Sequence, residues 1–298
     1  MKIIITAANG FMGEALVNYF SKAHEVVAIV RKSMTFENVK TCMWDGKNIG
    51  DWATEIDGAD VLINLAGKSV NCRYNEANKA AIYASRLEST TILGKAIEVC
   101  KNPPKIWINA ASATIYRHSL NDPMTEVTGE IGTGFSVDVC QKWEKSFFDF
   151  QLTNTRQVAL RTAIVLGKKG GVMTPFKRLT QLGFGGKMGE GQQQFSWIHI
   201  DDVCRSIEFI IENESLKGAL NVSSPNPIRN NVFMQALRQR YNRFAAIPSP
   251  VWLLELGAKL IKTETELILK SRFVMPEKLE QAGFKWKFPK IEDALEEC

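Results

Sequence analysis

The chain has 298 residues, of which 45% are hydrophobic and 23% charged, as in an ordinary globular protein. The net charge is only +5 and no long Lys/Arg run occurs, which argues against nucleic-acid binding. Six cysteines form no Cys-x-x-Cys pair and no metal-ligand spacing, and no apolar run is long enough to span a membrane. The chain starts directly with a core strand, without a signal peptide. We therefore expect a cytoplasmic protein without metal, in one large domain or two.

The first 20 residues contain a strand, a tight turn and a helix. Residues 3–5 are all isoleucine, which predicts a strand buried on both faces, and apolar residues recur at helical spacing from Gly13 onward. This is the layout of a dinucleotide-binding βα unit, in which the helix N-terminus holds a pyrophosphate. Gly10 would let the backbone approach the phosphates, and Gly13 would let helix and strand pack closely. A plain strand-turn-helix with small packing residues remains an alternative.

One position departs from the usual glycine spacing. A Gly-x-x-Gly-x-x-Gly pattern would place glycine at position 7, where this chain has Ala7. Alanine resists positive φ. We therefore expect a negative φ at Ala7, or a slight shift of the cofactor.

The second predicted strand, residues 24–33, ends in Arg31 and Lys32. In this fold the end of the second strand faces the adenosine ribose, where an acidic residue favours NAD and an arginine accommodates the 2′-phosphate of NADP. The basic residue favours NADP(H) over NAD(H). The alternative is a solvated charge pair after a strand.

Strand and helix patterns then alternate, which predicts an α/β fold with a doubly wound, mostly parallel sheet. Ligands of such sheets bind beyond the carboxyl ends of the strands. The expected strands lie at residues 39–45, 58–69, 105–116 and 156–167, and the expected helices at 75–100 and 138–150.

The pattern changes at about residue 168, where glycine-rich segments and short strands begin. We expect a helix at 201–213, a strand, turn and helix at 221–237, and a mostly helical segment at about 248–298. The prediction is a dinucleotide-binding domain at 1–167 and a smaller substrate-side region at 168–298, interleaved with the end of the sheet.

Several motifs together resemble a known family. In order they read TAANGFMGEALV, LINLAG, NAASATIY, LRTAIVLG and FSWIHIDDV. They are similar to the extended and atypical short-chain dehydrogenase/reductases. YASRLEST, VCQKWE, GGKMGEGQQQFSWIHIDD and MPEKLEQAGFKW resemble more closely the NAD-dependent epimerase/dehydratase or nucleoside-diphosphate-sugar epimerase subgroup, the last motif lying in its carboxy-terminal segment of unknown function.

The resemblance implies a set of cofactor contacts along the strand ends. These are Thr6, Ala7, Asn9, Gly10, Phe11, Met12 and Gly13 at the pyrophosphate, Arg31 at the 2′-phosphate, Leu65, Ala66 and Gly67 at the adenosine and its ribose, Ala110 and Ala111 beside the nicotinamide ribose, and Arg161 and Ile164 over the nicotinamide.

The catalytic residues of that family are only partly present. The family uses a serine, a tyrosine, and a lysine four residues after the tyrosine. Ser112 can stand for the serine, but aligning Glu144 with the usual glutamate places Ser136 at the tyrosine position and Cys140 at the lysine position. No Tyr-x-x-x-Lys occurs in residues 130–150. This departure argues against carbonyl reduction by the usual tyrosine mechanism.

Two residues could replace the missing phenol. Tyr116 follows Ser112 by four residues and is a candidate proton donor, although a packed tyrosine with a hydrogen-bonded hydroxyl is the preferred interpretation. Cys140 could act as a thiol near the nicotinamide, although a small buried hydrophobe is preferred.

Three further side chains are candidates for the substrate. His199 with the two aspartates that follow could form an acid-base pair, but an aspartate there is first of all a helix N-cap. Lys68 and Arg73 follow the LINLAG strand and could hold an anionic substrate, or could belong to a solvated loop.

Two functional classes therefore stay open. The first is an NADP(H)-dependent oxidoreductase or epimerase-type enzyme, monomer or homodimer, acting on a small polar substrate such as a nucleotide sugar. The second is a non-catalytic NADP(H)-binding redox sensor or regulatory protein. The glycine turn and the NAASATIY stretch favour bound cofactor, and the enzyme is the preferred hypothesis.

Overall fold

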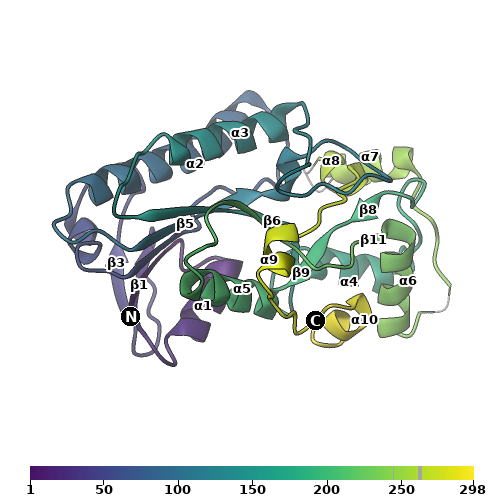
Figure 1. Cartoon of the computed structure of the whole chain (residues 1–298). Helices are drawn as coiled ribbons and strands as arrows, with labels where there is room; N and C mark the ends of the chain where they lie inside the picture. The colour runs from purple at the N-terminus through teal and green to yellow at the C-terminus, as the bar shows by residue number, and fades with distance from the viewer. Residues whose placement is uncertain (244, 261–263) are drawn as a thin grey trace.

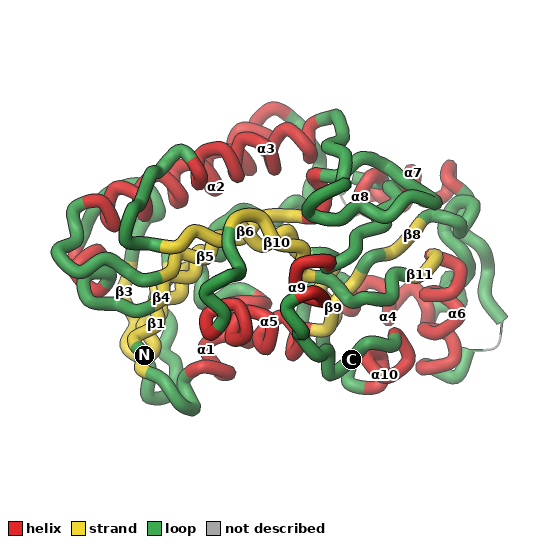
Figure 2. The backbone as a smooth tube through the Cα atoms, in the orientation of Figure 1, coloured by secondary structure: helices red, strands yellow, loops and turns green. Residues whose placement is uncertain are grey.

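A parallel β-sheet forms the centre of the molecule (Figures 1 and 2). The computed structural model describes residues 1–243, 245–260 and 264–298. Its sheet has seven strands in the order β10-β6-β5-β4-β1-β2-β3, and every pairing is parallel, which confirms the predicted doubly wound α/β fold. The strands are β1 (Lys2–Thr6), β2 (Glu25–Val30), β3 (Lys40–Met43), β4 (Val61–Asn64), β5 (Ile106–Ser112), β6 (Arg156–Thr162) and β10 (Gly218–Val222).

Helices cover both faces of this sheet. Helices α2 (Glu76–Glu98) and α3 (Phe135–Phe148) lie on one face, and α1 (Phe11–Phe20) and α5 (Ile200–Glu212) on the other (Figure 1). Because successive side chains of a strand point to opposite faces, Ile3 and Ile5 pack with α1 and α5. Ile4 packs on the other side with α2 and α3. The isoleucine run is therefore buried on both faces, as predicted.

The long helix α2 follows from its sequence. Asn75 is its N-cap, and its side chain accepts a hydrogen bond from the Asn78 amide at 2.8 Å. The residues predicted for its apolar side are all buried in the core: Ile82, Ile92, Leu93, Ala96 and Ile97.

The sheet order places a topological switch point between β1 and β4. From β1 the chain moves outward to β2 and β3, and later strands add on the other side, beginning with β4. Ligands of open parallel sheets bind beyond the carboxyl ends of the strands at such a point. The turn after β1 lies there.

The second half of the chain builds a smaller layer with its own core (Figure 1). Strand β10 comes from this half but pairs with β6 in the main sheet, so the boundary at 167/168 stays a prediction. Residues 261–263, part of the predicted helical segment 248–298, lie outside the described residues. The remaining elements are η1 (Asp51–Glu55), η2 (Ala113–Ile115), β7 (Ile164–Leu166), α4 (Met173–Gln181), β8 (Gln194–Phe195), β9 (Trp197–His199), β11 (Ile228–Arg229), α6 (Asn230–Arg240), α7 (Val251–Leu260), α8 (Glu266–Leu269), α9 (Glu277–Gln281) and α10 (Ile291–Glu296).

A buried carboxylate fastens the end of the chain to α5. Asp202 is fully buried and accepts the amide hydrogens of Lys287 at 2.7 Å and Phe288 at 2.8 Å. It also pairs with Arg205 at 3.1 Å. Charge-assisted bonds of this kind are among the stronger hydrogen bonds in proteins. The carboxy-terminal segment is thereby held against α5, which covers one face of the sheet.

We predict that Asp202→Asn lowers the free energy of unfolding by about 3 kcal/mol, because an amide cannot accept both backbone N–H groups and a buried charge pair is broken. The matched control is Asp201→Asn. Asp201 is 45% exposed and pairs with Lys287 at 2.8 Å, so its loss should cost about 1 kcal/mol or less. Urea denaturation of both variants measures the difference. Equal losses of stability in the two variants would contradict the proposed role of Asp202 in holding the carboxy-terminal segment.

Candidate functional site

The turn after β1 leaves the start of α1 open for an anion. Gly10 is the N-cap of α1 and has no side chain to bond the first helical amides. It is exposed, and its own amide donates to the Ala7 carbonyl at 2.9 Å. Unpaired amides and the helix dipole at an N-terminus favour a phosphate. The residues present therefore fit the pyrophosphate of a dinucleotide.

The expectation of a negative φ at Ala7 was wrong. Its φ is +50°, in the left-handed region, and not negative. The tertiary arrangement outweighs the preference of alanine, because the turn must bring the Ala7 carbonyl back over the start of α1. A Cβ on Gly13 would lie 2.4 Å from that carbonyl oxygen and 2.7 Å from the Cα of Ala8. Only glycine fits at position 13, as the motif requires.

Buried polar side chains join the ends of β1 and β4 to the middle of β5 beside this turn. The Thr6 hydroxyl donates to Asn64 Oδ1 at 2.7 Å and accepts the Leu65 amide at 3.1 Å. Asn64 Nδ2 donates to Asn109 Oδ1 at 2.7 Å. We call Thr6, Asn64 and Asn109 the polar ladder. Sequence reasoning missed both asparagines, although they belong to the LINLAG and NAASATIY motifs and Asn64 ends β4.

The expected adenosine side of the site is open to solvent. Arg31 is exposed, directly follows β2, and forms no ion pair with any described carboxylate. Strand β2 pairs with β1 in register up to Thr6 and Ile29, so Arg31 lies near the same strand edge as the turn. Such a cation can meet a phosphate without first giving up a partner.

The candidate proton donor Tyr116 is packed and hydrogen-bonded. It is 2% exposed, its hydroxyl donates to Asn221 Oδ1 at 2.9 Å, and it accepts from Arg161 Nη1 at 2.9 Å. Arg161 also makes a bidentate pair with Glu144, at 2.8 and 2.7 Å. The geometry fits the packed-tyrosine interpretation, and it commits the Arg161 side chain to this network. Ser112 stands at the end of β5 as the cap of η2.

The two positions that depart from the family pattern lie on α3. Cys140 is buried, and burial raises the pKa of its thiol to about 11, so it stays protonated near neutral pH. Ser136 Oγ lies 3.4 Å from the Tyr74 hydroxyl and 3.1 Å from Glu266 Oε2. A phenol from another segment thus reaches the Ser136 side chain. The sequence gives no local signal for this contact, because the residues are 62 positions apart.

His199 is a structural cap. Its Nδ1 accepts the Asp201 amide at 3.2 Å, so the N-cap of α5 is the histidine and the expectation of an aspartate cap was wrong. His199 is 3% exposed, packs on the Phe288 ring, and burial lowers its pKa. Among the described residues its Nε2 has no partner. Asp201 and Asp202 bind the carboxy-terminal segment instead.

The loop after β4 contacts the carboxy-terminal segment. Arg73 pairs with Glu264 at 3.3 Å, and the Tyr74 amide donates to the same carboxylate at 2.8 Å. Lys68 is half-buried and its amide donates to Ser85 Oγ at 2.8 Å. Arg73, whose side chain is 43% exposed, thus takes part in a contact between this loop and the carboxy-terminal segment.

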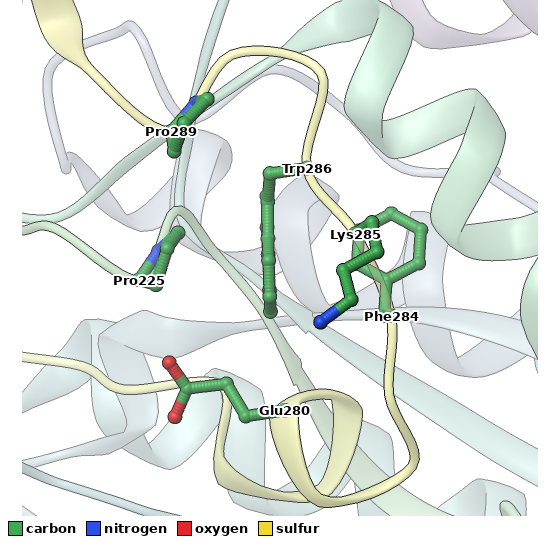
Figure 3. Close-up of a pocket in the computed structure, with 6 residues that line it drawn as sticks. All are labelled: Pro225, Glu280, Phe284, Lys285, Trp286 and Pro289. Atoms are coloured by element: carbon green, nitrogen blue, oxygen red, sulfur yellow. The ribbon is translucent and has the colours of Figure 1, made fainter.

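Two surface hollows lie away from the switch point. One, of about 400 Å³, surrounds the Trp286 indole between Pro225 and Glu280 (Figure 3). Its indole N–H already donates to the Ser223 carbonyl, just beyond the edge strand β10. The other, of about 490 Å³, is lined by α4 and Cys298. Neither includes the turn after β1.

Within the ranges that the structure describes, no helix is long and apolar enough to cross a membrane. In the same ranges no group of three or more His, Cys, Asp and Glu side chains could hold a metal ion.

A parallel sheet with an open, glycine-capped helix N-terminus at its switch point defines a Rossmann-type dinucleotide-binding protein. Residues 3–135 match the NAD dependent epimerase/dehydratase family, and residues 249–298 match a domain of unknown function (DUF1731). An epimerase family protein of Staphylococcus aureus (strain MRSA252), SAR0825, is 31% identical over 99% of this chain and 97% of its own length. The chain belongs to this epimerase family, as its motifs predicted.

Two solved structures support the same assignment. The human epimerase family protein SDR39U1 (isoform 2), solved with NADPH, is 30% identical, with a TM-score of 0.88 over 100% of this chain and 98% of that one. A nucleoside-diphosphate sugar epimerase from Corynebacterium glutamicum is 28% identical, with a TM-score of 0.79 over 99% of this chain and 57% of that one. Family membership thus shows an NAD(P)-binding epimerase/dehydratase-like protein.

We predict that Ala7→Gly raises the free energy of unfolding, by up to about 1 kcal/mol. The left-handed conformation destabilises an alanine in the folded state by about 1–2 kcal/mol, and glycine removes this strain. Glycine also makes the unfolded chain more flexible, which offsets about half of the gain in the free energy of unfolding. The neighbouring Ala8→Gly is the control. Ala8 is fully buried and has no positive φ, so it should lose stability. Denaturant titration compares the two, and a similar loss in both would refute the strained turn.

Proposed function

We propose that the chain is an NADP(H)-dependent oxidoreductase of the epimerase/dehydratase type, acting on a small polar substrate. The observation that carries this is the open, glycine-capped start of α1 beside an exposed Arg31 at the end of the neighbouring strand. The helix amides would hold the pyrophosphate and the guanidinium the 2′-phosphate. The human relative with NADPH supports the same cofactor for this chain.

When bound, the cofactor supplies or accepts a hydride. The residues of the chain bind and orient it: the turn after β1 at the pyrophosphate, residues 65–67 beside the adenosine, residues 110–111 beside the nicotinamide ribose, and Ile164 with the Arg161 backbone over the nicotinamide. Ser112, at the end of β5, would fix a substrate oxygen by a hydrogen bond. Each of these roles is part of the proposal.

Two phenols compete for the role of proton donor. Tyr116, the donor expected from the sequence, would have to release Asn221 before giving up its proton. Tyr74 is half-buried, and its hydroxyl lies beside Ser136, at the position where the family has its tyrosine. Burial raises the pKa of Tyr74, and the negative charge of Glu266 raises it further, whereas the hydrogen bond with Ser136 lowers it. The net pKa is raised, so the phenol is protonated near neutral pH. It can therefore donate, and Ser136 and Glu266 offer a path for its proton to be replaced.

The alternative function is a non-catalytic NADP(H)-binding sensor or regulatory protein. It is favoured by one observation, the serine and cysteine at positions 136 and 140 of α3. NADPH consumption, followed with a panel of carbonyl compounds and sugar nucleotides, separates the two functions. Firmly bound NADPH that no substrate consumes would favour the sensor.

We predict that the unmodified protein binds NADPH more tightly than NADH, and that Arg31→Asp removes this preference. A hydrogen bond to a charged group contributes roughly 1.5–3 kcal/mol, which is about 10- to 150-fold in affinity. Arg31→Lys should keep part of the preference, because the charge remains but the planar fork is lost. Lys22→Asp, a charge reversal on an exposed residue after α1, is the control. Equal affinities for both cofactors in the unmodified protein would contradict the assignment of NADP(H) as the preferred cofactor.

We predict that Tyr74→Phe lowers kcat by about 10²–10⁴-fold without loss of NADPH binding, as expected for removal of a positioned proton donor. Ser112→Ala should lower kcat as well. Tyr116→Phe should mainly lower the free energy of unfolding, because Arg161 and Asn221 lose a partner. Cys140→Ala should be nearly neutral in kcat. The reverse result, a lowered kcat in Tyr116→Phe and an unchanged kcat in Tyr74→Phe, would assign the role of proton donor to Tyr116.

A further inference from the structure

The guanidinium of Arg86, on α2, lies against the loop that follows β4. Its Nη1 donates to the Lys68 carbonyl at 3.0 Å and to the Ile82 carbonyl at 3.2 Å. A Cβ on Gly67 would lie 3.3 Å from the guanidinium carbon and 3.5 Å from both terminal nitrogens. The first of these spacings is tighter than an ordinary van der Waals contact. Glycine at position 67 therefore leaves the room that the guanidinium occupies.

A buried aromatic ring holds the same guanidinium from α3. Arg86 lies 4.9 Å from the centre of the Trp143 ring, within the range of a cation–π interaction. Trp143 is 5% exposed, and its indole N–H donates to Thr90 Oγ1 at 3.0 Å. The guanidinium is thus placed by a fixed ring and by the backbone of two segments. A ligand that binds it does not have to order a free side chain first.

The positive charge of Arg86 has no carboxylate partner among the residues that the structure describes. The nearby Arg161 pairs with Glu144, whereas Arg86 forms no ion pair within the described ranges. Its Nε and Nη2 make no hydrogen bond there either, since both printed bonds come from Nη1. A guanidinium held partly out of water is costly unless an anion joins it. The unbalanced charge and the unused N–H groups indicate a position for an anion.

The loop that Arg86 contacts begins beside the glycine turn. Strands β1 and β4 are parallel neighbours, and the Leu65 amide at the exit of β4 donates to the hydroxyl of Thr6, the last residue of β1, at 3.1 Å. Gly67 follows Leu65 by two residues. The Arg86 guanidinium therefore lies at the switch point, on the β4 side, where ligands of open parallel sheets bind.

Across the sheet, the candidate cofactor residues follow the order of the strands. Arg31 follows β2, the glycine turn follows β1, Arg86 contacts the loop after β4, and Ser112 ends β5. These strands are neighbours in the order β5-β4-β1-β2. The proposed function places the 2′-phosphate at Arg31 and the nicotinamide near Ser112. The pyrophosphate joins the two halves of a dinucleotide, so it lies between them, where the turn and Arg86 are.

We propose that Arg86 binds the pyrophosphate of NADP(H), together with the first amides of α1. The proposal deepens the proposed function and rests on it for the identity of the cofactor. A guanidinium can hold two phosphate oxygens at once through its fork of N–H groups. Arg31 then distinguishes NADPH from NADH, whereas Arg86 adds affinity for both cofactors, because both contain the pyrophosphate.

The test titrates the full chain with NADPH, with inorganic pyrophosphate and with adenosine 2′-monophosphate, each by isothermal calorimetry. Arg86→Gln should weaken the binding of NADPH and of pyrophosphate by about 10- to 100-fold. It should leave adenosine 2′-monophosphate unaffected, because that nucleotide has no pyrophosphate. Arg31→Asp should do the reverse with the last two probes. Lys95→Gln, a change at an exposed lysine on the same helix as Arg86, is the matched control.

Arg86→Lys guards against a folding defect in the neutral variant. It keeps the charge and loses the planar fork, so pyrophosphate binding should weaken by only about 3- to 10-fold.

The assignment is overturned if pyrophosphate does not saturate the unmodified chain. It is also overturned if Arg86→Gln, or Arg86→Lys where the neutral variant does not fold, binds pyrophosphate as tightly as Lys95→Gln. Equal weakening of all three probes by Arg86→Gln would overturn it too, because Arg86 would then only hold the loop. Failure of the unmodified chain to bind NADPH would instead defeat the proposed function, and the pyrophosphate titration would still test Arg86.

Discussion

The polar ladder of Thr6, Asn64 and Asn109 is the interaction on which the site depends. It joins the carboxyl ends of β1 and β4 to the middle of β5, where all three side chains are buried. A buried polar group without a partner costs about 1–3 kcal/mol, so each member holds the next in place. Asn64 also accepts the Ala66 amide, which directs the chain out of β4. The ladder thereby fixes the strand ends from which the glycine turn and the loop at residues 65–67 extend.

The elements of the sheet could be read from the sequence because local and tertiary demands agree there. The isoleucine run is buried on both faces, and the helix predicted at 75–100 is present, with Asn75 as its N-cap. The prediction failed at Ala7, where a local preference opposed the tertiary arrangement. The close approach of Gly13 to the Ala7 carbonyl fixes the turn, and alanine accepts a positive φ. A propensity is a weak guide where the backbone is packed on both sides.

The candidate site was predictable only in part, for a physical reason. The turn after β1 is contiguous in sequence, so its motif shows it. The Tyr74 hydroxyl reaches Ser136 on α3 from 62 positions away in the chain, and no periodicity or spacing links the two residues. The same limit explains His199. The local pattern indicated an aspartate cap, whereas the carboxylate of Asp202 is occupied by amides of Lys287 and Phe288.

The two halves of the chain therefore contribute different residues to the candidate site at the carboxyl ends of the strands. The first half presents a turn and an exposed arginine suited to a dinucleotide, while Lys270 and Arg272 of the second half donate hydrogen bonds to Thr114, just beyond β5. On α3, Ser136 and Cys140 carry neither a phenol nor an ammonium, yet the Tyr74 hydroxyl lies 3.4 Å from Ser136 Oγ. A phenol thus reaches α3 through a tertiary contact and not through a motif on that helix. It follows that the absence of Tyr-x-x-x-Lys from α3 is not sufficient to exclude catalysis.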